Sequence, residues 1–500
     1  MNSYSKILLN LFLFLICLIF GAIIAFSPLY AIAIFFLPVV FIFTMLAKVE
    51  LLGSFILITT FFIIGPLESF LRFPKAFWFS YIIGLLFFMR GIIDPKFFKF
   101  LYASKKNSLN NKLGAIMKIV ISLLLICMFL GTIFNYDNVP QIIFGVRDYI
   151  WLWGVFFLVW IGLIKQESLD KWMTSLIWCA ILQLPVVIYQ HFWVYGKRAA
   201  VVSDTSIAHD AIVGLFGGNP EGGGASGAMG VFCLIFSLMT YCLWRAKKVP
   251  FTIFLSVFIS SVLSVLLAEV KFVLLMTPLA ILFLHKFKDV MRPTRVILTI
   301  VLGGSIAIGG LYTYWQQYSA KGAKGYGSFS SYVSTFVDNN IDSKDINLLT
   351  GEMGRVSALT FWWHKHDVSA NPVTFLLGHG LGASRIGTFS GSAARNYSFK
   401  IARSSLAILL WEVGFLGSFA FILFLILGWK LSRVAYYESV NSPYHRSLFQ
   451  VFGASFLIFL FSLPYNTDII QTPQIQLLMI IFFSYLYCHF SNINRSKKLS

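Results

Sequence analysis

A chain of 500 residues is long enough for about three soluble domains, but its composition excludes that class of protein. Apolar residues make up 58% of the chain and charged residues only 12%, about half of the share in soluble proteins, so a globular fold could not cover its surface with polar groups. A net charge of +19 would indicate a nucleic-acid partner in a soluble protein, whereas in a membrane protein its meaning depends on where the charges lie.

A helix that crosses a bilayer needs about 20 mainly apolar residues. Fourteen such stretches predict an all-α, polytopic integral membrane protein. They lie at 7–26, 28–46, 50–66, 76–93, 114–134, 149–164, 172–194, 227–244, 251–268, 270–285, 296–314, 404–428, 447–464 and 474–490. We expect the first stretch to be a retained helix, because no small-residue cleavage site follows it. The predicted organisation is about eleven spans in 1–314, a large, partly helical loop in 315–403 and about three spans in 404–500.

The basic residues gather in short loops between these stretches. The basic segments are 94–112, 245–248, 286–295, 430–446 and 495–498. With fourteen spans, all of them fall on one side of the membrane together with both termini. Cytoplasmic loops are the ones rich in Lys and Arg, so we expect both termini in the cytoplasm and the long loops 195–226 and 315–403 on the outer face. Nearly all of the net charge then lies inside, and the outer face is close to neutral.

The six cysteines lie in apolar stretches without Cys-x-x-Cys spacing, which predicts buried thiols and neither disulfides nor a zinc site. His364 and His366 would diverge on the helix expected at Glu352–His366, so we do not expect them to bind a metal. Three aspartates of the large loop fit a solvated segment better than a magnesium site. They are Asp338, Asp342 and Asp345.

Glu269 and Lys271 interrupt an apolar stretch at a tight turn on the outer side. Charges at membrane depth are costly and therefore need a reason. Either the turn reaches water at the interface, or Lys271 points at an anionic substrate and Glu269 holds it there. The glycine-rich segment Gly214–Gly224 is either a flexible loop before a span or a place where backbone amides approach an anion. No Walker lysine follows it, which excludes a nucleotide-binding P-loop.

The end of the large loop carries Gly378-His379-Gly380-Leu381-Gly382, and Arg403 then opens the next span. A basic residue at the start of a helix opposes the helix dipole, so we expect Arg403 to have an anionic partner, either a substrate or a lipid phosphate. Glu412 lies inside the apolar span, and a lone glutamate there is a functional candidate.

The glycine motif at 378–382, followed by Glu412-x-Gly414-x-x-Gly417, resembles the bacterial O-antigen ligase/polymerase superfamily. Three further features are similar to the same pattern and extend the resemblance over roughly residues 210–420. They are Gly354-Arg355 with Trp362, the loop Phe216–Gly224 and the Glu269-x-Lys271 turn. The resemblance implies a multi-pass enzyme of the bacterial inner membrane whose active site is periplasmic.

Ligases of this superfamily carry a histidine where this chain has Arg403 before Ser404. An arginine at that distance before a glycine resembles Wzy-type polymerases instead. Members also have an arginine close before the glycine loop, where this chain has His209 and Asp210, with Lys197 and Arg198 further back. The resemblance is therefore closer to the polymerases.

A polymerase of this kind joins undecaprenyl-pyrophosphate-linked oligosaccharide repeat units into O-antigen or another surface polysaccharide. The catalytic candidates are Arg403, Glu412, Glu269 and His379, of which the last three could act as base for the acceptor hydroxyl. The candidates for binding the pyrophosphate are Lys271, Arg403, Arg355 and Arg198, because cations stabilise its developing charge.

The implied partners are the lipid-linked oligosaccharide, membrane lipid, a chain-length regulator and a flippase, with no nucleic acid, metal or cofactor. Two alternatives stay open: an O-antigen ligase or O-oligosaccharyltransferase of the same superfamily, and a polysaccharide transporter or flippase. The sequence shows no internal repeat of the kind found in many transporters.

Overall fold

The computed structural model describes residues 38–73, 75–98, 112–194, 212–219, 223–284, 293–320, 327–341, 351, 353–387 and 389–499. Within these ranges the chain is helical apart from one short ladder, in which β1 (Gly218–Asn219) pairs antiparallel with β2 (Gly223–Gly224). The all-α prediction is therefore confirmed. The expected span at 7–26 lies outside the described residues.

The helices follow the apolar stretches in chain order. Before the glycine-rich segment they are α3 (Val49–Ile58), the π turn η1 (Thr59–Ile63), α4 (Ile64–Ser69), α5 (Trp78–Ile93), α7 (Lys112–Phe134), α8 (Val139–Tyr149), the 3-10 turn η3 (Trp151–Trp153), α9 (Gly154–Trp160), α10 (Gln166–Tyr189) and the π turn η4 (Gln190–Val194). After it come η6 (Gly214–Phe216), α13 (Ser226–Arg245), α14 (Phe251–Leu267), α15 (Lys271–Leu284), α17 (Pro293–Ala320), α18 (Phe329–Ile341), α19 (Arg355–Lys365), α20 (Pro372–Leu377), η7 (Ala394–Asn396), α21 (Ser405–Glu438), α22 (Pro443–Ser462), α23 (Asp468–Gln471) and α24 (Pro473–Leu499).

Seven helical segments within the described residues are long and apolar enough to cross a bilayer, which is typical of an α-helical membrane protein. They are Val49–Ser69, Leu113–Phe134, Gln166–Val194, Ser226–Arg245, Ser405–Glu438, Pro443–Ser462 and Pro473–Asn492. The structure does not support the predicted count of fourteen, because several of the expected stretches form shorter or bent helices.

Two physical causes account for part of this difference, and the expected stretch 7–26 and most of 28–46 lie outside the described residues. The helices α5, α14 and α15 have 16, 17 and 14 residues, fewer than the roughly 20 that a straight span requires. The stretch expected at 149–164 forms only η3 and α9, and these join α8 at a bend of 43°. Counting that bent pair as one span raises the total from seven to eight.

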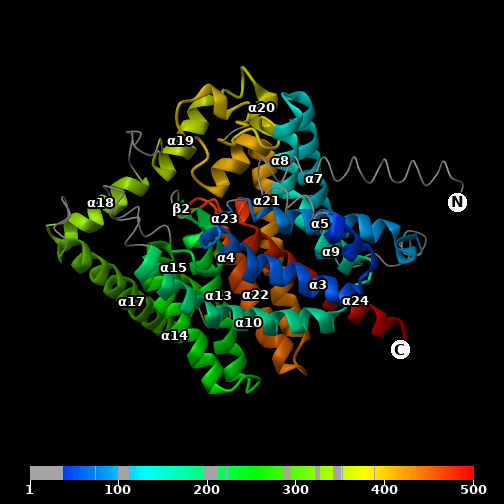
Figure 1. Ribbon diagram of the computed structural model, residues 1–500, viewed down its shortest axis with the longest axis horizontal. Coiled ribbons are helices and arrows are strands. Elements are labelled where there is room, and N and C mark those ends of the chain that lie inside the picture. Colours follow the sequence, from blue (N-terminus) through cyan, green and yellow to red (C-terminus); the bar gives the residue numbers. More distant parts are fainter. Residues whose placement is uncertain are drawn as a thin grey trace, which may run out of the picture.

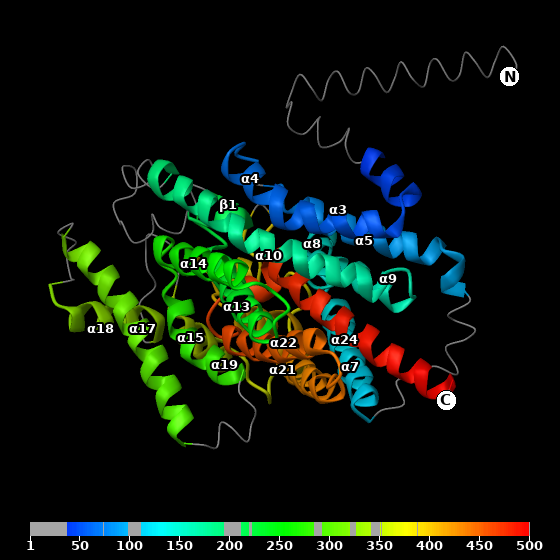
Figure 2. The ribbon, with the colours of Figure 1, turned by 90° about the horizontal axis from the view of Figure 1, so that it is seen from below.

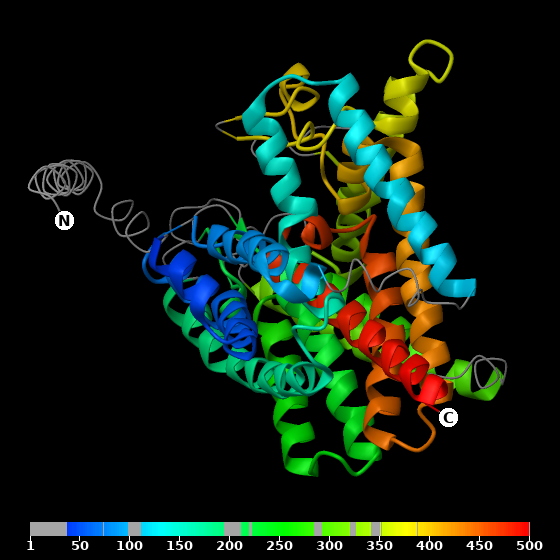
Figure 3. The same ribbon diagram turned by 90° about the vertical axis from the view of Figure 1, so that its right-hand side faces the viewer.

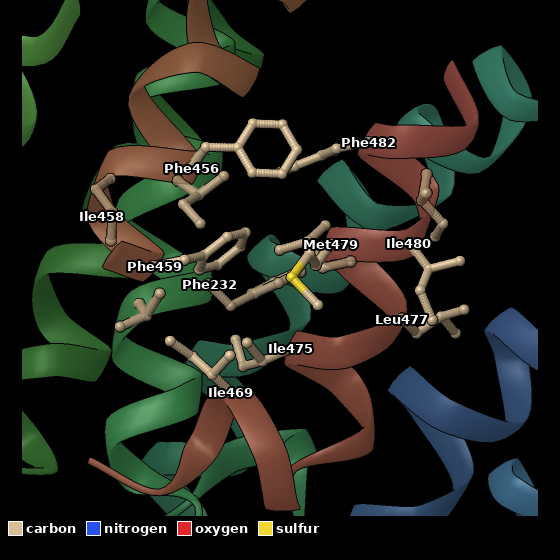
Figure 4. Packing of buried hydrophobic residues seen from close by; sticks show 14 of the residues in the cluster. Phe232, Phe456, Ile458, Phe459, Ile469, Ile475, Leu477, Met479, Ile480 and Phe482 are labelled. Carbon is tan, nitrogen blue, oxygen red and sulfur yellow. The ribbon is translucent and has the colours of Figure 1, made fainter. Parts of the chain in front are cut away.

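The core of the molecule is built from helices of the C-terminal part together with α13. The long helix α21 packs along both α22 and α7, and α22 also packs against α13 and α15. Figure 4 shows aromatic and branched side chains from four elements filling this space, among them Phe232, Phe456, Ile469 and Phe482. The rings of Phe452 and Phe482 stack with their centroids 4.3 Å apart. This packing fixes α22 and α24 beneath the loops described below.

The helices of the expected large loop lie at the periphery of the molecule. Figures 1 and 3 show α19 and α20 at one end, near α8 and the end of α7, while α17 and α18 form a separate edge. In contrast, α3, α10 and α24 run side by side through the body (Figure 2). The expected helix Glu352–His366 is present as α19 (Arg355–Lys365).

The described cysteines have free thiols, and four of them are buried, as their apolar surroundings predict. These four are Cys127, Cys179, Cys233 and Cys242, whereas Cys488 is partly exposed. Cys17 lies outside the described residues.

Candidate functional site

The glycine motif of the large loop packs against a break in α21. Gly414 has φ 68° and ψ −169° inside that helix, a conformation that interrupts the helical backbone. The N–H of His379 donates to the carbonyl of Trp411 at 2.8 Å, and the N–H of Gly380 donates to that of Glu412 at 3.1 Å. The loop thus supplies hydrogen-bond partners to the carbonyls beside the break.

The contact requires glycine on both sides. A Cβ on Gly378, which has φ 75°, would lie 2.5 Å from the backbone nitrogen of Gly414. A Cβ on Gly414 would lie 2.4 Å from the nitrogen of Gly378. Positive φ and this close approach both exclude a side chain. The two glycine motifs noticed in the sequence are therefore the two halves of one backbone contact.

This contact brings the Glu412 carboxylate to the turn that follows the glycine motif. Glu412 is only 4% exposed, and its Oε1 accepts hydrogen bonds from the hydroxyl of Ser384 at 2.7 Å and from the Ser384 N–H at 3.4 Å. Buried carboxylates need such partners. The next residue, Arg385, places its guanidinium 3.8 Å from the ring centroid of Phe144 on α8.

Ser384 and Arg385 line a cavity of about 410 Å³. Five segments that are distant in the sequence contribute to its wall: the end of α4, the end of α8, the segment between η6 and α13, the loop before α21, and the junction of α23 and α24. The charged residues of the wall are Glu68, Arg147, Asp148, Arg385 and Lys400. The cavity wall thus holds three cationic and two anionic side chains.

Arg147 is the most deeply buried of the cations. It is 5% exposed, its Nε donates to Asp148 Oδ1 at 2.7 Å, and its Nη2 lies 2.5 Å from the same oxygen. The guanidinium also lies within 4.6 to 5.5 Å of the ring centroids of Phe77, Trp78, Tyr81 and Phe144. Its Nη1 is buried without a hydrogen-bond partner among the described residues. A buried donor of this kind is costly unless a bound group satisfies it.

Buried glutamines fix the floor of the cavity. Gln190 accepts hydrogen bonds from the N–H groups of Val213 and Gly214, at 2.9 and 2.7 Å. Gln183 accepts from the Leu215 N–H at 2.8 Å, and Gln474 donates to the Phe216 carbonyl at 2.8 Å. The start of the glycine-rich segment is thus held rigidly, and Phe216 and Gly217 form part of the cavity wall.

Of the predicted cations, Arg355 packs on Tyr465. The guanidinium of Arg355 lies 4.1 Å from the centroid of the Tyr465 ring, and its Nε donates to the Tyr465 carbonyl. Phe272 stacks on the same ring at 4.1 Å, whereas the Nζ of its neighbour Lys271 lies 5.0 Å from the ring centroid of Tyr332 on α18. We call Phe272, Arg355 and Tyr465 the Tyr465 group. None of the three belongs to the cavity wall.

Glu269 and Arg403 border the Tyr465 group. Glu269 is buried in the turn before α15 with φ 52°, and its carbonyl accepts a hydrogen bond from the Lys271 N–H at 2.9 Å. Arg403 donates from Nε to the Met353 carbonyl at 3.2 Å, and its neighbour Ala402 lines the cavity. Arg403 therefore directly follows a residue of the cavity wall, whereas Glu269 lies outside that wall. Arg198, His209 and Asp210 lie outside the described residues.

Asp468 connects the Tyr465 group to the cavity. Its carboxylate accepts a hydrogen bond from the Thr472 hydroxyl at 3.1 Å, and Thr472 belongs to the cavity wall. Burial raises the pKa of Asp468 to about 6, although the Thr472 hydrogen bond and the charge of Arg355 both oppose that shift.

His379 occupies an aromatic core outside the cavity. Its Nε2 lies 2.9 Å from Nε2 of His366, and both rings pack against Trp411. Burial, and to a lesser extent the neighbouring His366, lower the pKa of His379 to about 4, so that imidazole is neutral near neutral pH. The His366–His379 pair therefore lies within an aromatic core, and the role of His379 as a base stays a prediction.

Sequence reasoning missed the five charged residues of the cavity. Each of them follows or precedes an expected apolar stretch or motif: Glu68 comes just after 50–66, and Arg147 and Asp148 come just before 149–164. Arg385 comes three residues after Gly382. All five lie in segments that the distribution of Lys and Arg places on the outer face of the membrane. That shared face could have indicated from the sequence that they lie close together.

No protein-family model matches the chain, and no curated protein matches it significantly. Among the described residues, no three His, Cys, Asp or Glu side chains gather closely enough to hold a metal ion.

Proposed function

We propose that the protein is a membrane glycosyltransferase that polymerises undecaprenyl-pyrophosphate-linked oligosaccharide repeat units into O-antigen or another surface polysaccharide. The observation that carries the proposal is the buried Arg147, with an unsatisfied Nη1, in the wall of a cavity that Arg385 and Lys400 also line. Such an arrangement suits a multiply charged anion. The motif resemblance at Gly378–Gly382 and Glu412–Gly417 supports pyrophosphate as that anion.

The proposal includes a location. The motif resemblance implies the bacterial inner membrane, and the apolar stretches allow up to fourteen spans. The loop charges favour both termini in the cytoplasm and the segment 315–403 on the outer, periplasmic face. The five segments that form the cavity all belong to the outer face in that assignment, which supports a periplasmic active site. Repeat units that have already crossed the membrane would then enter from the lipid, with their pyrophosphate at the level of the cavity.

Each charged residue of the cavity has a proposed role. Arg147, Arg385 and Lys400 stabilise the negative charge that develops on the pyrophosphate as the bond to the sugar breaks. Asp148 or Glu68 accepts the proton of the attacking hydroxyl, because these carboxylates line the cavity, unlike Glu412, Glu269 and His379. Arg355, Lys271 and Arg403 stay part of the proposal as cations outside the cavity wall.

Reconstitution with lipid-linked repeat units tests the proposed reaction. The purified protein in a lipid bilayer is supplied with one type of undecaprenyl-pyrophosphate-linked unit, and products are separated by size. We expect a ladder of products and release of undecaprenyl pyrophosphate. Transfer of a single unit to lipid A-core or to a protein would instead assign a ligase or O-oligosaccharyltransferase, and movement of units across the bilayer without bond formation would assign a flippase.

A further inference from the structure

We infer that Glu412 is a positioning residue whose buried carboxylate holds the Ser384–Arg385 turn, and so presents Arg385 to the cavity. The inference rests on the proposed function for its consequence in catalysis, but its structural content is independent of the reaction. It differs from the role of base that the sequence suggests for Glu412.

The side chain of Glu412 is hydrogen-bonded to the turn, while its charge also acts on Asp148 and Arg385 of the cavity wall. Its Oε1 accepts two hydrogen bonds from Ser384, a residue that is itself buried. Ser384 and Arg385 belong to the cavity wall, whereas Glu412 does not. A base has to reach the proton that it removes. Ser384 lines the cavity that a substrate would occupy, whereas Glu412 does not line it.

The Ser384–Arg385 turn carries a guanidinium group whose position depends on the turn. Arg385 lies near Arg147, and burial together with that like charge lowers the pKa of Arg385. Asp148 and Glu412 offset part of the repulsion between the two guanidinium groups, but burial and the like charge together still favour movement of Arg385 toward water if the turn is free. Glu412 counteracts this through the hydrogen bond to Ser384, and Phe144 offers the guanidinium a ring face.

The position of Glu412 is itself fixed by the backbone contact of Gly378 with Gly414. The carbonyl of Glu412 accepts a hydrogen bond from Gly380 while its side chain accepts from Ser384. The main chain of Glu412 therefore binds Gly380 and its side chain binds Ser384, the two ends of the segment 380–384. The spacing between Arg385 and Arg147 follows from the place of Glu412 in α21.

Substitution by glutamine separates positioning from proton transfer. Glu412→Gln keeps a carbonyl oxygen that accepts the Ser384 hydroxyl, but it cannot accept a proton. Glu412→Ala loses both functions, and Ser384→Ala removes only the hydroxyl donor. Glu438→Ala, at the exposed end of the same helix, is the matched control.

The first readout is the rate at which Ile386→Cys is alkylated by a water-soluble maleimide, measured on the peptide that contains it. Ile386 is 47% exposed and lies in the cavity wall, so its accessibility reports on the turn without requiring activity. We expect Glu412→Ala and Ser384→Ala to change the rate roughly tenfold, as the loss of a hydrogen bond to a buried charge implies. Glu412→Gln and Glu438→Ala should stay close to the parent protein. Equal rates in Glu412→Ala and the parent, or equal rates in Glu412→Gln and Glu412→Ala, would overturn the inference.

The second readout is polymerisation in the reconstituted system. Glu412→Gln should retain most of the activity that Glu412→Ala loses. An inactive Glu412→Gln with a parent-like alkylation rate would show proton transfer and overturn the inference. If the parent protein makes no polymer, the proposed function fails, and the alkylation rates still decide whether Glu412 positions the turn. If Glu412→Ala does not fold, Ser384→Ala answers the same question.

Discussion

Gly378 and Gly414 meet backbone to backbone, so close that a Cβ on either residue would lie within 2.5 Å of the other's backbone nitrogen. They are 36 positions apart in the sequence, at the end of α20 and inside α21. Their contact inserts the glycine loop into the broken helix and sets the positions of Glu412, Ser384 and Arg385.

Replacing either glycine by alanine should destabilise the protein strongly. Both residues have positive φ, which alone costs about 1–3 kcal/mol for a residue with a side chain, and the clash with backbone adds to this. Thermal unfolding in detergent measures the effect. Gly304→Ala is the control, because a Cβ there meets nothing within 4 Å and alanine favours the helix. Equal melting temperatures for Gly378→Ala and Gly304→Ala would contradict the contact.

The histidine pair should make stability depend on pH. Burial lowers the pKa of both His366 and His379, the latter from 6.5 to about 4, so the folded state binds protons less readily than the unfolded state. Stability is then fully present above about pH 6.5 and is lost as the pH falls toward 4.

This dependence is measured as the difference in melting temperature between about pH 7.5 and about pH 5. His379→Gln should reduce the difference. His364→Gln is the control and should not reduce it, because His364 is an exposed residue of α19. A wild-type pH dependence in His379→Gln would show that the pair is not its source.

Gln190→Leu should loosen the floor of the cavity. The substitution leaves the N–H groups of Val213 and Gly214 buried without an acceptor, at about 1–3 kcal/mol each. In its protonated form, Gln190→Glu keeps both the acceptor and a donor for the Gly214 carbonyl, and it should cost less. Chemical or thermal unfolding compares the two variants, and an equal loss of stability in both would assign the effect to side-chain packing instead.

Arg385→Ala and Arg355→Ala separate the cavity from the Tyr465 group. If the cavity holds the pyrophosphate, Arg385→Ala should lower polymerisation by roughly 100-fold, the usual effect of removing one group that stabilises the developing charge. Arg355 stacks on Tyr465 and lies outside the cavity wall, so its loss should have a smaller effect. A larger loss of polymerisation in Arg355→Ala than in Arg385→Ala would instead assign the pyrophosphate to the residues that the sequence alone suggested.

The sequence predicts the helical segments of this protein better than it predicts the cavity. Hydrophobicity placed the helical segments well, since the stretches from 50–66 onward all fall on helices. It overestimated the spans, because length and bending depend on breaks such as those around Tyr149 and Lys271, which hydropathy does not detect. The motif at Gly378–Gly382 forms a backbone contact with α21 that the sequence did not predict.

The cavity was harder to predict for a physical reason. Glu68, Arg147 and Arg385 are each single charges at segment ends, where an ion that faces water looks the same in a sequence. Only the packing of α4, α8 and the loop before α21 brings them to one space. The buried state of Arg147, which distinguishes it from Arg395 at 50% exposure, exists only in the folded chain.

The most direct test of the central claim is the binding of a short-chain polyprenyl pyrophosphate to the purified protein, measured by calorimetry for wild type, Arg147→Ala and Arg395→Ala. The account predicts binding by wild type and Arg395→Ala, and affinity lower by roughly tenfold or more for Arg147→Ala, since a hydrogen-bonded charge is lost. Binding by Arg147→Ala as tight as that of wild type would contradict it.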